Sequence, residues 1–152
     1  MKSFIIVLFT VLITSIPSFI TSGKRNINDD KFVFITRDAE VKHYIQRYML
    51  PYGQLWMKVA RTESGFYCDS YSARIRKNVF GMNYPQTRPT VAIGKDKNGY
   101  AIYQSIDDAV YDLLIRIEAR PPKPNESFYF YLRRTGYNPS DEYYEYLKRI
   151  KI

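Results

Sequence analysis

The stretch GYAIYQSIDDAVYDLLIRIEARPP, residues 99–122, joins a short strand to the clearest helix of the chain. Ser105, followed three residues later by Asp108, resembles a capping box and predicts that the helix starts there. The pair Pro121-Pro122 predicts that it ends before them. Its apolar residues recur at helical spacing and predict a stripe that faces the core: Ile106, Ala109, Val110, Leu113, Leu114 and Ile117.

A β-hairpin is expected just before this helix, because residues 90–93 and 100–103 have the composition of strands and Asn98-Gly99 between them favours a tight turn. Capping residues and helix breakers predict further helices. Thr36 starts the first and Leu50-Pro51 ends it, Pro51 lies in the first turn of the second, Asn125 caps one from about residue 126 to 134, and Ser140 caps the last. The sequence therefore predicts a mainly α (α+β) domain, in which a helical lobe and a small β-hairpin lobe form a cleft.

The run ARTESGF, residues 60–66, places Glu63 near the end of the second helix. At about 100° per residue, Glu63 shares a face with apolar residues and so points toward the protein. A carboxyl group partly removed from water has a raised pKa and can stay protonated near neutral pH, as the general acid of a glycosidase does. The alternative is an ordinary helix-end glutamate, solvated or paired with Arg61 or Lys58. The expected inward face comprises Leu55, Trp56, Val59, Thr62 and Phe66, and the opposite face comprises Gln54, Met57, Lys58, Arg61 and Ser64.

The N-terminus indicates export, because Lys2 precedes an apolar run at residues 4–20 and small or polar residues at 21–23. We expect residues 1–23 to be a signal peptide, residues 24–35 a polar leader and residues 36–152 one catalytic domain. The alternative is an uncleaved membrane anchor, with membrane contact through this segment alone. Either way the protein is expected in the periplasm, the cell envelope or the extracellular space.

The net charge and the cysteine count limit the binding partners and the kinds of site that the chain can have. Lys and Arg number 23 against 15 Asp and Glu, a net charge of +8, so an exported chain is drawn to polyanions such as cell walls rather than to nucleic acid. Cys68 is the only cysteine and His43 the only histidine, which excludes an internal disulfide and a histidine-rich zinc site. One cysteine and one histidine are only a weak indication of a nucleophilic pair. The alternative is that Cys68 is a small buried thiol without a catalytic role. We expect no metal and no cofactor.

Five segments together resemble a known family: ARTESGF (60–66), NVFGM (78–82), RPTVAIG (88–94), GYAIYQSIDDAVYD (99–112) and TGYNPSDEYYEYLKRI (135–150). In order and spacing they resemble the bacterial and phage glucosaminidase family of peptidoglycan hydrolases. The resemblance implies a lysozyme-like fold and cleavage of the glycan strands of peptidoglycan.

The resemblance also implies roles for individual residues. Glu63 corresponds to the catalytic acid, and Tyr137 matches a tyrosine that lines the cleft, although Asn138-Pro139 replaces the usual Ala-Thr after it. The β lobe offers only Asp96 as a second carboxylate, and the alternative for Asp96 is a solvated loop acid. Assistance by the substrate's N-acetyl group, water positioned by Asp69, and a lytic transglycosylase reaction with one Glu stay open. Candidate substrate-binding residues are Phe80 and Met82, which also fix the cleft wall, Arg88, which could pair with Glu63 or with substrate carboxylates, and Tyr103.

These expectations combine into a secreted, monomeric hydrolase of β-1,4 bonds in peptidoglycan, of the endo-β-N-acetylglucosaminidase type. Lytic transglycosylase and muramidase activities remain compatible with the sequence. The alternative is a non-catalytic module of the same fold that binds cell-wall glycan or a protein partner.

Overall fold

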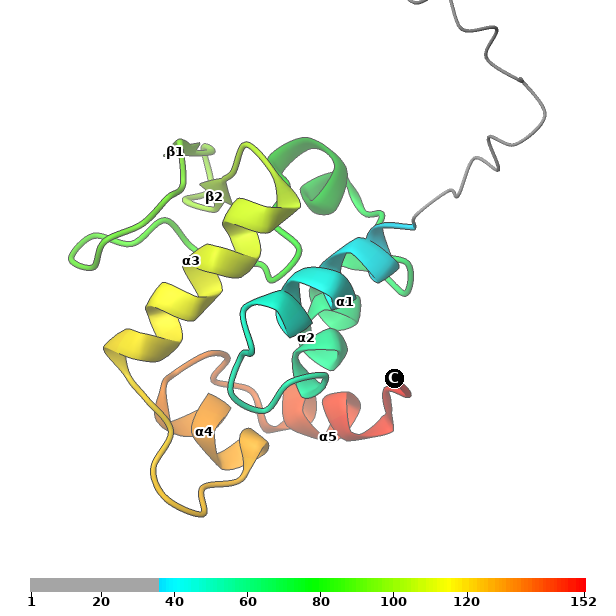
Figure 1. The fold of residues 1–152 in the computed structure, drawn as a ribbon, viewed down its shortest axis with the longest axis vertical. Coiled ribbons are helices and arrows are strands. Elements are labelled where there is room, and N and C mark those ends of the chain that lie inside the picture. The colour runs from blue at the N-terminus through cyan, green and yellow to red at the C-terminus, as the bar shows by residue number, and fades with distance from the viewer. Residues whose placement is uncertain (1–35) are drawn as a thin grey trace, which may run out of the picture. The chain divides into compact units, whose positions relative to one another are not determined.

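The fold is mainly α with one small β-hairpin, as predicted (Figure 1). The computed structural model describes residues 36–152, so the predicted signal peptide and leader lie outside the described residues. The helices are α1 (Arg37–Arg47), α2 (Leu55–Ser64), α3 (Ile106–Ala119), α4 (Phe128–Arg134) and α5 (Asp141–Arg149), with a short π-helical turn η1 (Ser72–Arg76) and the strands β1 (Gly94–Lys95) and β2 (Ala101–Ile102). Within this part of the chain, no helix has the length and apolarity needed to cross a membrane.

Side-chain caps fix where most helices begin. The hydroxyls of Thr36, Ser105 and Ser140 each accept a backbone N–H at the start of α1, α3 and α5, as predicted. At α3 the capping box is complete, because the Asp108 carboxylate accepts the Ser105 N–H at 3.0 Å. The predicted cap of α4 was wrong: Ser127 caps it, and Asn125 has a positive φ of 60° in the preceding turn.

The second helix begins later than predicted. Pro51 does not lie in its first turn, because Tyr52 and Gly53 have positive φ values of 68° and 49°, which no α-helix accommodates, and α2 starts at Leu55. The Pro51 carbonyl instead accepts the indole N–H of Trp56 at 2.8 Å.

The inward face of α2 is also wider than predicted. Met57 and Ser64 are buried, because α2 packs against both α1 and α5 rather than against one neighbour. Phe66 is 59% exposed, because the helix ends at Ser64 and the chain turns away at Gly65, where φ is 85°. The predicted single stripe is therefore wrong at these three positions.

Trp56 of α2 is the centre of the aromatic core. Its side chain is 1% exposed, and the rings of Phe80, Phe128 and Tyr131 meet it edge to face at centroid distances of 6.4, 5.1 and 6.3 Å. Edge-to-face contacts of this kind are favourable beyond the area that they bury. Trp56 thus joins the first turn of α2 to α4 and to the loop after η1.

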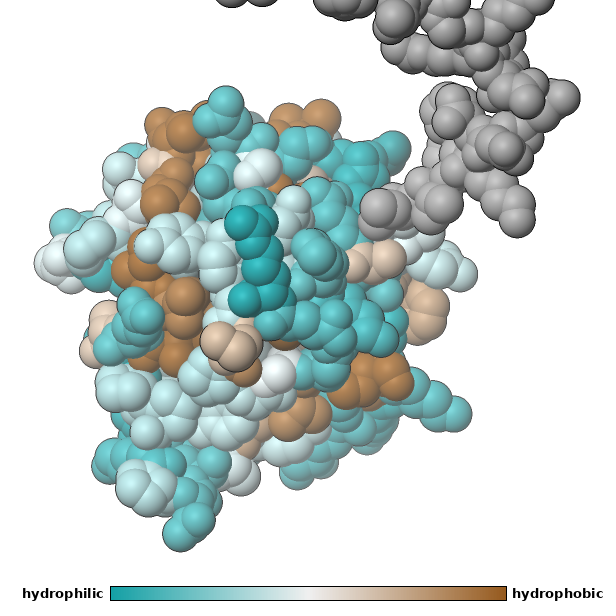
Figure 2. All heavy atoms as spheres, viewed as in Figure 1, coloured by the Kyte–Doolittle hydropathy of each residue, from teal (hydrophilic) through white to brown (hydrophobic). Residues whose placement is uncertain are grey.

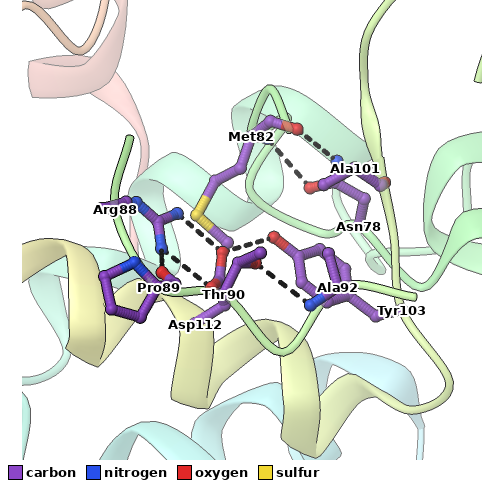
Figure 3. Close-up of polar contacts among 9 residues, drawn as sticks. All are labelled: Asn78, Met82, Arg88, Pro89, Thr90, Ala92, Ala101, Tyr103 and Asp112. Atoms are coloured by element: carbon purple, nitrogen blue, oxygen red, sulfur yellow. Dashed lines mark hydrogen bonds and ion pairs between the residues drawn. The ribbon is translucent and has the colours of Figure 1, made fainter. Parts of the chain in front are cut away.

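The hairpin lobe is small and is held by a side chain from outside it. Gly94 pairs with Ile102 and Lys95 with Ala101, so the first strand lies C-terminal to its predicted position at 90–93. The buried amide of Asn78 donates to the carbonyls of Met82 and Ala101 at 2.8 and 3.0 Å and accepts the Met82 N–H at 2.9 Å. Asn78 therefore fixes the 78–82 loop against β2 (Figure 3).

A buried carboxylate attaches this lobe to α3 (Figure 3). Asp112 is fully buried, and both of its oxygens accept hydrogen bonds from the Arg88 guanidinium, at 2.8 and 2.7 Å. The Tyr103 hydroxyl donates to it at 2.8 Å. Burial by itself raises the pKa of Asp112, but the hydrogen bonds from Arg88, Thr90 and Tyr103 outweigh it, so the pKa lies below its ordinary value.

Asp112→Asn tests this attachment. The substitution keeps the shape of the side chain but leaves the Arg88 guanidinium in a largely buried site without a counter-charge, so we expect the free energy of unfolding to fall by about 3 kcal/mol in urea denaturation. Glu118→Gln, at an exposed position of the same helix, is the control and should change it by less than about 0.5 kcal/mol. Equal, small effects of the two substitutions would contradict the assigned role.

The pH dependence of stability gives a second readout of the same variant. Because the pKa of Asp112 is lowered on folding, its contribution is present above the pKa of an unfolded Asp and is lost as the pH falls through the folded value. We expect this acid-side loss in the wild type and its reduction in Asp112→Asn.

Candidate active site

Glu63 lies in the last turn of α2 and reaches α5. The Tyr143 hydroxyl donates a hydrogen bond to Glu63 Oε1 at 2.7 Å, across 80 residues of sequence. Burial raises the pKa of Tyr143 well above its ordinary range, with further contributions from Tyr137 and Glu63. Tyr143 is therefore a neutral donor to the carboxyl group.

The cations near Glu63 in sequence have other partners. The Arg61 guanidinium donates to both oxygens of Asp38, at 2.8 and 2.9 Å. The Lys58 ammonium donates to the Tyr129 hydroxyl and the Lys148 carbonyl at 3.3 and 3.2 Å. The alternative of a Glu63 paired with Arg61 or Lys58 was therefore wrong.

The surroundings of Glu63 favour its protonated form. Burial is the main cause and raises its pKa, and the Tyr143 hydrogen bond lowers it in part, so the net shift is upward. Among residues 36–152, no Lys or Arg forms an ion pair with Glu63 that would reverse this shift. The group keeps its proton to a higher pH than an exposed glutamate does, as a general acid requires.

The backbone of Gly81 closes the other side of the carboxyl group. A Cβ atom added to Gly81 would lie 2.5 Å from Glu63 Oε2 and 3.1 Å from its carboxyl carbon, too close for any side chain. Gly81 also has a φ of 60°, in the left-handed region that favours glycine. The carboxyl group of Glu63 is thus held between the 78–82 loop and α5.

A pocket of about 240 Å³ opens onto this carboxyl group. Its walls come from the end of α2, the loop after η1, the hairpin, α3 and the turn after α4, so it lies between the hairpin lobe and the helices as the predicted cleft does. Glu63 is the only acid among its lining residues. They are Glu63, Gly81, Met82, Asn83, Tyr100, Arg116, Gly136, Tyr137 and Asn138.

The structure brings Tyr137 into the same pocket as Glu63. Its ring lies between Trp56, at 5.9 Å between centroids, and the Arg116 guanidinium, at 4.9 Å from the ring centroid. Its hydroxyl donates to the Phe80 carbonyl. Burial raises the pKa of Tyr137 far above its ordinary range, so it is a neutral wall residue at any physiological pH.

Phe80 and Met82 belong to the wall rather than to the open surface. Phe80 is fully buried and contributes its carbonyl to Tyr137, while its ring packs on Trp56. Met82 is 2% exposed and lines the pocket. Both side chains support the cleft wall. Phe80 does not line the pocket, so the prediction that it binds substrate was wrong, because its ring is buried against Trp56.

Arg88 and Tyr103 are not brought to Glu63. Both bind Asp112, so the predicted alternative of an Arg88–Glu63 pair was wrong. Arg88 lines a second hollow of about 400 Å³ instead. Tyr103 is 2% exposed and holds β2 onto α3.

Asp96 is used by the hairpin turn. Its Oδ1 accepts the N–H groups of Asn98 and Tyr100, both at 2.9 Å, and its Oδ2 pairs with Arg76 at 2.6 Å. Asp96 does not line the Glu63 pocket, and neither does Asp69, which is exposed in the loop after α2. The structure therefore places no second carboxylate beside Glu63 among the residues that it describes.

Cys68 and His43 do not form a nucleophilic pair. Burial is the main cause that raises the pKa of the Cys68 thiol to about 11, so it is not a thiolate at neutral pH. His43 is exposed on α1, with its ring against Tyr44. Over residues 36–152, no group of three His, Cys, Asp or Glu side chains is placed to hold a metal ion.

Tyr143 and Arg116 were not predicted as residues of the site, and Gly81 was predicted only as part of the cleft wall. Tyr143 had only the signal of an apolar helix position, and Arg116 lies on α3 between the apolar positions. Each acts through a partner at least 18 residues away, as the pair of Gly81 and Glu63 shows. The one usable signal was the glycine, since a glycine inside a buried loop often marks a close backbone approach.

Gly81→Ala tests the close approach to Glu63. We expect it to lower the free energy of unfolding by about 2 kcal/mol more than the control Gly53→Ala does. Both positions have a positive φ, which destabilises any Ala there, but a Cβ at Gly53 meets nothing within 4 Å. In a Glu63→Ala background the cost of Gly81→Ala should fall toward that of the control, which a double-mutant cycle in urea measures. Equal costs at the two glycines would contradict the contact.

Comparisons with known proteins address the fold alone. No protein-family model and no curated protein sequence matches this chain. A chain in the solved structure of a type VI secretion system effector–immunity complex from Pseudomonas protegens matches with a TM-score of 0.51 and 21% identity, over 74% of this chain and 89% of that chain. At this identity, the similarity is one of fold.

Proposed function

We propose that this protein is a peptidoglycan hydrolase of the glucosaminidase type, which cleaves β-1,4 bonds of cell-wall glycan with Glu63 as the general acid. One observation carries the proposal: a carboxyl group with a raised pKa opens onto a pocket and is held by a neutral donor, with no ion-pair partner among the described residues. The five sequence segments that resemble the glucosaminidase family support it, since three of them supply Glu63, Gly81 and Tyr137.

The pocket favours a mechanism with one protein carboxylate. Glu63 gives its proton to the glycosidic oxygen as the bond to the anomeric carbon breaks, and the Tyr143 hydroxyl stabilises the carboxylate that remains. With no second acid in the lining, the N-acetyl oxygen of the substrate attacks the anomeric carbon and forms a cyclic intermediate. Glu63 then accepts a proton from the water that opens it, which regenerates the acid.

Glu63→Gln tests the acid role directly. Gln keeps the size and the hydrogen bond from Tyr143 but has no proton to give, so we expect clearing of a peptidoglycan suspension to fall by at least about 100-fold. Glu118→Gln, at an exposed position of α3, is the matched control and should clear at the wild-type rate.

Circular dichroism checks that the Glu63→Gln variant is folded. A folded variant that clears cell walls as fast as the wild type would overturn the proposal. Mass spectrometry of the released fragments identifies the bond that is cut. It also separates reducing ends, which hydrolysis produces, from the anhydro ends of a lytic transglycosylase.

Tyr143→Phe changes the pH range of the acid. The lost hydrogen bond is the one that lowers the pKa of Glu63, so that pKa rises further and the alkaline limb of the activity profile moves to higher pH. Tyr146→Phe, at a half-exposed position of the same helix, should leave the limb in place. A shift to lower pH in Tyr143→Phe would mean that the hydrogen bond does not act on the proton-donating group.

The second candidate function is a non-catalytic module that binds wall glycan or a protein. Two observations favour it: the pocket has a single acid, and the solved structure with the similar fold is a complex of an effector with an immunity protein. Sedimentation with insoluble peptidoglycan, without release of soluble fragments, would establish the glycan-binding form.

A further inference from the structure

A basic hollow adjoins the Glu63 pocket. It measures about 400 Å³ and lies between the 85–88 segment, the end of α3 and the turn after α4. Arg116 and Gly136 line both this hollow and the Glu63 pocket, so the two lie side by side and share these residues as a wall. A substituent on a ligand in the Glu63 pocket is therefore within reach of the Arg116 side chain.

Two of the three arginines in this hollow keep their positive charge available. Arg88 is neutralised by Asp112. Arg116 lies in the last turn of α3 and Arg120 directly follows the helix, and within residues 36–152 neither forms an ion pair with a carboxylate. No acid lines the hollow, so it presents an uncompensated positive charge beside the Glu63 pocket.

The two guanidinium groups are held in place by neutral partners. Arg116 lies over the face of the Tyr137 ring, 4.9 Å from its centroid, and Arg120 donates to the Thr135 carbonyl at 3.1 Å. A guanidinium stacked on a ring keeps its edge free for two parallel hydrogen bonds, the geometry that suits a carboxylate. Tyr137 therefore holds the Arg116 guanidinium over its ring while it lines the pocket of Glu63.

We propose that Arg116, assisted by Arg120, binds a carboxylate on a side group of the glycan, so that the site prefers strands carrying lactyl or peptide carboxylates over neutral polymers of N-acetylglucosamine. This inference rests on the proposed function, because it requires a glycan in the Glu63 pocket. It assigns the net positive charge of the chain a local role in substrate choice.

Binding to the full-length Glu63→Gln protein tests the inference without turnover. The probes for titration calorimetry are chitotetraose, which is neutral, and the tetrasaccharide of alternating N-acetylglucosamine and N-acetylmuramic acid, with and without its peptides. We expect both anionic probes to bind about tenfold more tightly than chitotetraose. The stronger of the two identifies the carboxylate as lactyl or peptide.

Arg116→Gln in the same background should remove most of this preference, measured as the ratio of the affinities for the anionic probes to the affinity for chitotetraose. Arg116→Lys, which keeps the charge but not the fork geometry, should retain only part of it. Arg74→Gln, at an exposed position of η1, removes the same charge elsewhere and should leave the preference intact.

The outcomes separate the two proposals. Equal binding of neutral and anionic probes, or an Arg74→Gln loss as large as that of Arg116→Gln, overturns the carboxylate site and leaves the hydrolase proposal standing. Failure of every probe to bind, together with wild-type protein that does not clear walls, overturns both.

Discussion

The buried bond between Asp112 and Arg88 holds the two parts of this small domain together. Asp112 projects from α3 into the buried interior, and Arg88 and Tyr103 satisfy its charge from the hairpin side. A hairpin with two residues in each strand has too few backbone bonds to keep a fixed position by itself. The carboxylate therefore determines where the hairpin lobe lies and, with Asn78, where the wall of the Glu63 pocket lies.

The raised pKa of Glu63 depends on the same packing of the 78–82 loop against the helices. The end of a helix is normally a polar place, yet here α5 and the 78–82 loop cover it, and the neighbouring cations are taken by Asp38 and by α5. Burial without a counter-charge raises the pKa of the carboxyl group, and the neutral Tyr143 limits the rise. On the face shown in Figure 2 much of the surface is hydrophilic, and hydrophobic residues gather on the side of the hairpin and α3.

Local features of the fold could be predicted from the sequence, and contacts between distant segments could not. Ser105 and Ser140 start helices because a cap acts within three residues, and Asn98-Gly99 makes a turn for the same reason. The burial of Met57 and Ser64 depends on α1 and α5 covering α2 from two sides, which the period of one helix does not reveal.

Glu63 was predicted from its own helix, but its partners Tyr143 and Gly81 come from segments that only the tertiary fold brings near. Asp96 was predicted as a second catalytic carboxylate because it is the only acid of the hairpin lobe. Its carboxylate instead accepts backbone N–H groups of the turn and pairs with Arg76.

The pKa values of Glu63, which is partly buried, and of Asp112, which is fully buried, are shifted in opposite directions. Glu63 takes up its proton at a higher pH than a free glutamate, and Asp112 keeps its charge to a lower pH than a free aspartate. Between these two values the domain holds a protonated acid and an ionised anchor at the same time. Below this window the Asp112 carboxylate loses its charge and its bond to Arg88, and above it Glu63 loses its proton, so two side chains on different helices set the two limits.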